Sequence, residues 1–137
     1  MDKGIYTLII RLKEERRILV GSLGSIVFPG GYYAYTGSAR GSGGLKRLER
    51  HKRLMQSQNQ ARRWHIDYLL PSVDFIGSVI THTDKNLECM IAKRIGVELS
   101  AISAFGCADC SCCSHLHYSE NLDRISSVVL NAHKKLR

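Results

Sequence analysis

Two tyrosines in the first third of the chain have a type and a setting that suit work on a phosphate group. Tyr6 lies in the apolar run that begins at Gly4, and Tyr35 precedes Gly37 at the end of another run, about thirty residues later. A tyrosine near a phosphate can donate a hydrogen bond, or act as a base if its pKa is lowered. A glycine at the end of a strand lets the backbone or a substrate come close. Either tyrosine alone is also an ordinary sheet aromatic, so its interpretation depends on the residues around it.

Two arginines and a histidine follow at helical spacing. Arg47, Arg50 and His51 occur at i, i+3 and i+4, so a helix places them on one face. The guanidinium fork of an arginine suits a phosphate, both for binding it and for stabilising charge that develops on it. The alternative is an ordinary charged surface that keeps the chain soluble.

Glu88 is a carboxylate in an apolar setting. In a helix it falls inside an apolar arc, between Ile95 and Ala92. A carboxylate there is costly unless it has a partner. Mg²⁺ is a natural partner, because this hard cation takes oxygen ligands and often uses only one or two protein carboxylates. A salt bridge to an arginine is the alternative.

Positive charge is concentrated in one part of the chain. The formal net charge is +8, and residues 1–70 carry all of the excess. The densest stretch has eight basic residues against Glu49: Arg40, Lys46, Arg47, Arg50, Lys52, Arg53, Arg62 and Arg63. A concentrated basic patch is the footprint expected for a polyanionic partner such as nucleic acid. A solvated helix face is the plainer interpretation.

A polar and aromatic cluster follows the basic stretch. Trp64, His65 and Asp67 stand directly after Arg62 and Arg63. An exposed tryptophan beside arginines could stack on a nucleic-acid base, although a lone tryptophan is more often a core residue. We expect His65 and Asp67 to orient one another or to line a cleft.

Four of the five cysteines are crowded into one segment. They are Cys107, Cys110, Cys112 and Cys113, and His115 and His117 follow them. The set contains enough ligands for tetrahedral Zn²⁺, but zinc sites usually separate two ligand pairs by a longer spacer.

The interpretation that we favour for this segment is a compact loop. In it Asp109, Cys110 and His115 pack near the cleft. Zn²⁺ binding and a reversible disulfide are the alternatives, because crowded cysteines in a cytoplasmic chain suggest metal or redox chemistry more than a disulfide scaffold.

The elements that must position these residues are those of a mixed α/β (α+β) domain. The expected strands are 4–12, 18–20, 26–28, 32–35 and 75–81, and the first four, joined by tight turns, suggest a meander. The expected helices are about 45–57 and about 84–95, with Asp84 as the cap and Gly96 as the end of the second, and a short amphipathic segment lies at 64–70. The apolar run at 122–135 is compatible with a strand or a helix, and we favour a helix. Residues 106–120 are expected to be irregular.

The length of 137 residues fits one domain. No long apolar run occurs, so we expect neither a signal peptide nor a membrane span, and a cytoplasmic protein.

Taken together, the residues resemble the GIY-YIG nuclease superfamily. The matches are Gly4-Ile5-Tyr6, Tyr35-Thr36-Gly37, Arg47 and His51 in the following helix, and Glu88 on a later helix. The strings YAYTGSARGSGGL, WHIDYLL and CADCSCCSHL also resemble a prokaryotic branch of that superfamily catalogued as a domain of unknown function. This second similarity covers nearly the whole chain, with the motif core at about 3–96 and the Cys/His-rich loop and C-terminal segment at 106–137.

The resemblance implies a small antiparallel sheet flanked by helices, and an endonuclease that hydrolyses phosphodiester bonds with one Mg²⁺ or Mn²⁺ ion. It implies that Glu88 holds the ion, that Tyr6 or Tyr35 serves as the base, that Arg47 stabilises the pentacovalent phosphate, and that His51 assists proton transfer. DNA is favoured over RNA as the substrate, and repair is the pathway suggested by analogy.

The nucleic-acid contacts that we expect are Gly37, Ser38, Arg40, Lys46, Arg50, Arg62, Arg63, Trp64 and His65. The expected second cluster is Asp67, Asp109, Cys110, Cys112 and His115, of which the resemblance favours the two cysteines as family positions. The chain departs from the family at Thr36, where relatives have an aliphatic residue, and at Ser38, where many have lysine. The side chain at position 36 should therefore matter less than those of its neighbours.

Two other functions remain compatible with the sequence. One is a nucleic-acid-binding module without catalysis, based on the basic stretch. The other is a protein regulated by zinc or by redox chemistry, based on the cysteines. No recognition helix is readable, so a nuclease of this size would need a partner protein for targeting.

Overall fold

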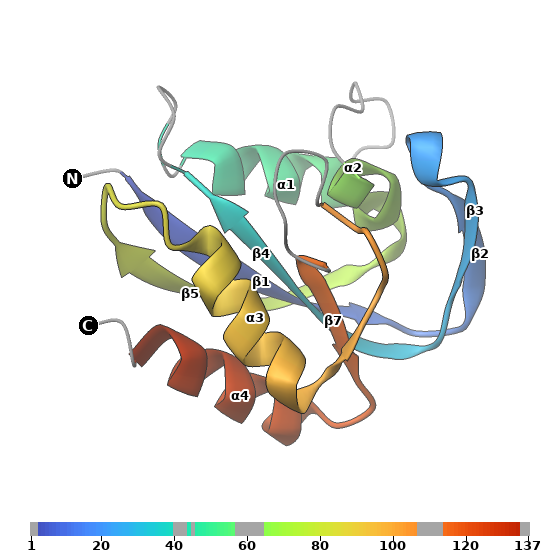
Figure 1. Ribbon diagram of the computed structural model, residues 1–137. Coiled ribbons are helices and arrows are strands. Elements are labelled where there is room, and N and C mark those ends of the chain that lie inside the picture. The colour runs from blue at the N-terminus through green and yellow to red at the C-terminus, as the bar shows by residue number, and fades with distance from the viewer. Residues whose placement is uncertain (1–2, 40–43, 45, 57–64, 107–113, 135–137) are drawn as a thin grey trace.

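A small antiparallel sheet forms the centre of the protein (Figure 1). The computed structural model describes residues 3–39, 44, 46–56, 65–106 and 114–134. Within them, five strands pair in the order β5-β1-β4-β7-β6. The strands are β1 (Gly4–Leu12), β4 (Gly31–Ser38), β5 (Asp74–His82), β6 (Ser100–Ala101) and β7 (Leu116–Ser119). Every pairing is antiparallel, so the predicted fold class is confirmed.

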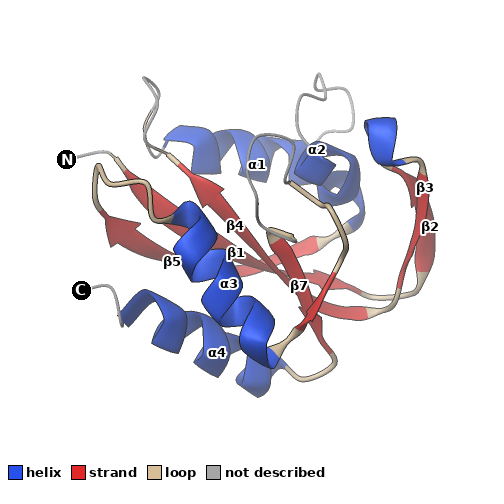
Figure 2. Ribbon diagram, in the orientation of Figure 1, coloured by secondary structure: helices blue, strands red, loops and turns tan. Residues whose placement is uncertain are grey.

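Helices cover both faces of the sheet, and the sheet separates two apolar cores. The helices are α1 (Lys46–Gln56), α2 (His65–Leu69), α3 (Glu88–Glu98) and α4 (Leu122–Lys134). Successive residues of a strand point to opposite faces. Leu8 and Ile10 of β1 therefore join one core with α1 and α2, whereas Ile5 and Ile9 join the other with α3 and α4. Figure 2 shows α3 and α4 lying together across one face of the sheet.

The central strand β1 is buried on both faces. Its residues GIYTLIIRL are all buried except Arg11. The β-branched and aliphatic side chains suit a strand with a neighbour on each side, and β1 pairs with both β4 and β5. The first motif segment therefore lies at the most constrained place in the fold.

The meander predicted for the first four strands is wrong in one respect. Strands β2 (Arg16–Leu19) and β3 (Ser25–Phe28) pair only with each other, as a separate two-stranded ribbon, with the 3₁₀ turn η1 (Gly21–Leu23) between them. Most of their side chains are exposed or half-buried, which does not suit a place inside the main sheet. Strand β4 returns past the ribbon to pair with β1.

Three boundaries differ from the prediction. Helix α3 begins at Glu88, after Leu87, so Asp84 is not its cap. Gly96 lies inside α3, where a Cβ atom would come 3.0 Å from Nε2 of His117, so this glycine makes room for a neighbour and does not end the helix. Strand β7 occupies part of the stretch expected to be irregular, because Leu116 to Ser119 pair with β4.

The remaining helices follow the sequence closely. Helix α1 and helix α4 lie where they were predicted, and α2 leads into the 3₁₀ turn η2 (Leu70–Ser72) around Pro71. In the part of the chain that is described, no helix combines the length and the apolar character that crossing a membrane requires.

Candidate active site

The two tyrosine motifs meet on neighbouring strands. Tyr6 of β1 is the register partner of Gly37 of β4, so the first motif lies directly beside the second. The ring of Tyr6 crosses over the glycine, and a Cβ atom at position 37 would come 2.4 Å from its hydroxyl oxygen. Only glycine leaves this space open.

The hydroxyl of Tyr6 contacts a histidine of α1. Its oxygen lies 2.7 Å from Nε2 of His51, and both side chains are almost completely buried. Burial lowers the pKa of His51 to about 4; the negative charge of Asp67 opposes this, and the positive charges of Arg50 and Arg47 add smaller effects in the same direction as burial. His51 is therefore neutral at pH 7, so it can accept the Tyr6 hydroxyl proton in a hydrogen bond.

Both tyrosines share one electrostatic environment. Burial raises the pKa of Tyr6, the charge of Arg47 lowers it, and the charge of Glu88 raises it. Burial also raises the pKa of Tyr35. The charges of Tyr6 and Glu88 raise it further, and the charge of Arg47 lowers it. Four of the predicted catalytic residues thus lie close enough to act on one another. The fifth, His51, also packs edge-on against the Tyr35 ring, with centroids 6.1 Å apart.

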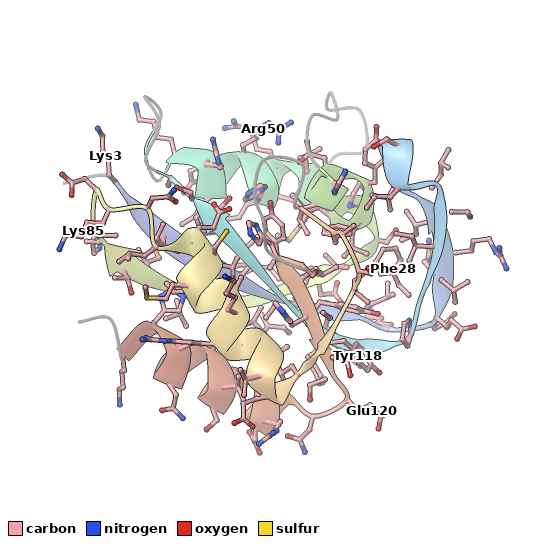
Figure 3. All side chains as sticks on the ribbon, viewed as in Figure 1. Lys3, Phe28, Arg50, Lys85, Tyr118 and Glu120 are labelled. Carbon is pink, nitrogen blue, oxygen red and sulfur yellow. The ribbon has the colours of Figure 1, made fainter. Side chains whose placement is uncertain are left out.

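Helix α1 presents its two arginines to different partners. Arg47 is half-buried and donates to the backbone carbonyl of Ser38, which attaches α1 to the end of β4. Arg50 donates through both terminal nitrogens to the two oxygens of Asp67, each at 2.9 Å. Asp67 is completely buried, so this bidentate pair fixes α2 against α1. In Figure 3 Arg50 lies on α1 at the top of the molecule.

Glu88 has a histidine partner. At the start of α3, its Oε1 lies 3.0 Å from Nδ1 of His115. The Glu88 side chain is 21% exposed and that of His115 only 2%. Among the described residues, the partner of this carboxylate is a histidine and not the arginine that the sequence offered as an alternative. Cys89, the next residue, is disulfide-bonded.

His65 positions the segment before the cysteines. Its Nδ1 accepts a hydrogen bond from the backbone N–H of Gly106, at 2.9 Å, and its ring packs edge-on against Phe105. Gly106 has a φ of +75° and lies close to the rings of both Tyr35 and His115. His65, which the sequence predicted as a nucleic-acid contact, thus holds the backbone that lies beside Tyr35.

Exposed lysines and arginines occur on α1 and at the end of the β1–β5 pair. Lys46 and Arg53 of α1 are exposed, and Ser38 is half-buried at the end of β4. Lys3 and Lys85 are exposed at the end of the β1–β5 pair, where the backbone N–H of Thr83 bonds to the carbonyl of Lys3. Figure 3 shows these two lysines pointing outward at one side of the molecule.

Several predicted residues lie outside the described part of the chain. They are Arg40, Arg62, Arg63, Trp64, Asp109, Cys110 and Cys112, together with Cys107 and Cys113. Among the residues that the structure does describe, no three histidine, cysteine or acidic side chains come together as a metal-binding group.

The sequence did not reveal a buried polar network behind the motif strands. Oγ1 of Thr7 lies 3.0 Å from Oγ1 of Thr36 and 2.8 Å from Nε2 of His133 on α4. Oγ1 of Thr81 lies 2.8 Å from Nδ1 of the same histidine. Thr36, whose side chain was expected to matter less than those of its neighbours, is thus a buried, hydrogen-bonded residue. The polar histidine within the apolar face of the last helix was the signal that could have indicated it.

Fold and site together define a mixed α+β domain with a buried tyrosine–histidine pair beside an arginine and a carboxylate. The family model described as "Domain of unknown function DUF123" matches residues 5–137, and the chain belongs to that family. Searches of curated proteins and of solved structures gave no match.

Proposed function

We propose that the protein is a metal-dependent endonuclease of the GIY-YIG type that hydrolyses phosphodiester bonds in nucleic acid, with DNA the favoured substrate. The observation that carries the proposal is the hydrogen bond between the Tyr6 hydroxyl and Nε2 of neutral His51, in the field of both Arg47 and Glu88. A proton acceptor, a cation and a carboxylate around one hydroxyl are the parts that phosphoryl-transfer chemistry requires.

Tyr6 is the better candidate for the base than Tyr35. Burial raises the pKa of both phenols, so a free tyrosinate would be costly in either place. Tyr6 avoids that cost because it can release its own proton to Nε2 of His51 while its oxygen takes a proton from the attacking water. The water becomes hydroxide, His51 becomes imidazolium, and Tyr6 ends unchanged.

Arg47 supplies the positive charge. Its half-buried guanidinium, anchored on the Ser38 carbonyl, acts on Tyr6 and so lies near the hydroxyl that would activate the attacking water. An arginine held in this way can stabilise the extra negative charge on a pentacovalent phosphate without reorganising. Arg50, held by Asp67, positions α1 and is not the clamp in this scheme.

Glu88 fits the role of a metal ligand. Its carboxylate is partly exposed, and Mg²⁺ or Mn²⁺ commonly uses one or two protein carboxylates while water and substrate phosphate complete the coordination. When bound, such an ion lowers the pKa of a bound water and stabilises the charge of a leaving oxygen. That help matters here, because His51, with its low pKa, is a weak base.

A nicking assay tests the proposal. Supercoiled plasmid and labelled single-stranded and branched oligonucleotides are incubated with the protein and Mg²⁺ or Mn²⁺. We expect cleavage by the wild type and none by Glu88→Ala or Arg47→Ala. Glu120→Ala and Arg17→Ala, which remove exposed residues of the same types outside the basic stretch, should cleave like the wild type. Cleavage that survives Glu88→Ala contradicts the assignment.

Non-catalytic binding is the second candidate, favoured by the exposed Lys46 and Arg53 on α1. Both functions predict an affinity that falls steeply with salt, so only turnover separates them. If wild type and Glu88→Ala bind equally and neither cleaves any substrate, the binding module is the correct function.

A further inference from the structure

Glu88 and His115 form a pair that takes no part in the proposed proton transfer from Tyr6 to His51. Nδ1 of the imidazole and Oε1 of the carboxylate are 3.0 Å apart, and the histidine is almost completely buried. Two ligands about 2.1 Å from one metal ion and at right angles to each other are also separated by about 3 Å. The pair therefore has the spacing of two neighbouring ligands of one ion.

The backbone holds His115 in a fixed place. Its N–H donates to the carbonyl of Phe105 at 2.8 Å, and its carbonyl accepts from the N–H of Thr36 at 2.9 Å. Thr36 is the middle residue of the second motif, so the position of His115 is set directly by β4. A ligand anchored in this way is preorganised, which favours tight metal binding.

The far side of the imidazole ring has an acceptor for its proton. Nε2 of His115 lies 3.8 Å from Sγ of Cys89. Because Cys89 is disulfide-bonded, its sulfur carries no proton and can only accept. A neutral ring with its proton on Nε2 presents the lone pair of Nδ1 toward Glu88. Two lone pairs that face one another at this distance repel. A cation that binds both atoms would remove this repulsion.

We propose that Glu88 and His115 together bind one transition-metal ion, and that His115 makes the site select Mn²⁺ over Mg²⁺. Imidazole nitrogen is a good ligand for transition metals, whereas Mg²⁺ strongly prefers oxygen. The inference rests on the proposed function only in taking Glu88 as a metal ligand, and it adds the second ligand and the preferred ion.

The test measures metal binding to the full-length protein without nucleic acid. Calorimetric titration with Mn²⁺ alone and with Mg²⁺ alone should give an affinity for Mn²⁺ that is about tenfold higher or more. Pulsed electron paramagnetic resonance of the Mn²⁺-loaded protein should show the coupling of a directly bound nitrogen. Absence of that coupling in the wild type would overturn the proposal without any variant.

His115→Asn separates a ligand from a hydrogen-bond partner. Asparagine keeps a donor near the place of Nδ1 but removes the imidazole. We expect the nitrogen coupling to disappear and the Mn²⁺ affinity to fall by about ten- to hundredfold, with a much smaller change for Mg²⁺. His82→Asn, at an exposed histidine, is the matched control and should behave like the wild type. Circular dichroism checks that each variant is folded.

Two results would refute the direct-ligand role. One is an equal fall in the Mn²⁺ and Mg²⁺ affinities of His115→Asn, which means that His115 only orients Glu88. The other is an unchanged Mn²⁺ affinity. Neither reading depends on cleavage, so failure of the nuclease proposal would appear separately, as metal binding without turnover.

Discussion

The Tyr6 hydroxyl occupies the space that a side chain on Gly37 would need. The two residues are register partners on β1 and β4, and the distance from an ideal Cβ at position 37 to the Tyr6 oxygen would be 2.4 Å. The glycine of the second motif is thus explained by the tyrosine of the first.

We therefore expect Gly37→Ala to displace Tyr6 from His51. Overpacking of this kind typically costs about 1–3 kcal/mol of stability. A shift of a reacting group by about 1 Å can reduce the rate by about a hundredfold. Cleavage assays and urea denaturation measure the two effects. Gly77→Ala on β5 is the control, because a Cβ there meets no atom within 4 Å. Equal behaviour of the two variants would contradict the steric argument.

The proton relay predicts that the two tyrosines are not equivalent. Tyr6→Phe removes the hydroxyl that contacts His51, so we expect a loss of cleavage of about 10²–10⁴-fold. Tyr35→Phe leaves that contact intact and should reduce cleavage less. Single-turnover rates at saturating substrate measure the difference. A larger loss for Tyr35→Phe would transfer the base role to Tyr35.

The ion pair between Arg50 and Asp67 predicts a stability effect. Asp67→Asn leaves the Arg50 guanidinium without its buried carboxylate, which should lower the free energy of unfolding by about 3 kcal/mol. Urea denaturation of this variant, of Arg50→Met and of the double variant forms a thermodynamic cycle. If the two single effects simply add, the pair makes no specific contribution.

Acid should destabilise the protein through His117. Burial lowers its pKa from 6.5 to about 4, with a further lowering by His115. Between these values the unfolded chain binds the proton more readily than the folded one. The contribution of the neutral ring to stability is therefore complete above pH 6.5 and is lost as the pH falls toward 4.

His117→Leu tests this dependence. Nδ1 of His117 is buried and has no hydrogen-bond partner among the described residues, so leucine removes a polar atom that the fold does not satisfy there. The slope of unfolding free energy against pH, between pH 4 and 6.5, should decrease by up to about 1.4 kcal/mol per pH unit. Titrations at pH 7.5 provide the baseline, where only the packing difference remains. An unchanged slope would contradict the assignment.

The sequence predicted the elements better than their connections. The β-branched run at 4–12 predicted the correct strand, because that pattern is local. The apolar run at 122–135 was compatible with a strand or a helix, and the helix that we favoured is confirmed. The sequence predicts β2 and β3 as part of the main sheet, whereas they form a separate ribbon. Strand order depends on long-range pairing, which local patterns do not show. The sequence predicts Gly96 as the end of a helix. The contact with His117 that explains this glycine joins residues far apart in the chain, so the sequence does not show it.

The sequence indicates the candidate residues of the site but not the contacts between them. Tyr6, Tyr35, Arg47 and Glu88, which the motifs select, share one electrostatic environment in the fold. The contacts of His115 with Glu88 and of Asp67 with Arg50 join residues far apart in the chain, so no spacing rule indicates them. The sequence shows which groups are available, and the fold decides which of them pair.

The network behind the motif strands gives α4 an influence on a site that it does not reach. Thr7 follows Tyr6 in β1, Thr36 precedes Gly37 in β4, and both are tied through hydrogen bonds to His133. A change that moves α4 would therefore act on both motif strands at once, although the helix packs on the face of the sheet opposite Tyr6.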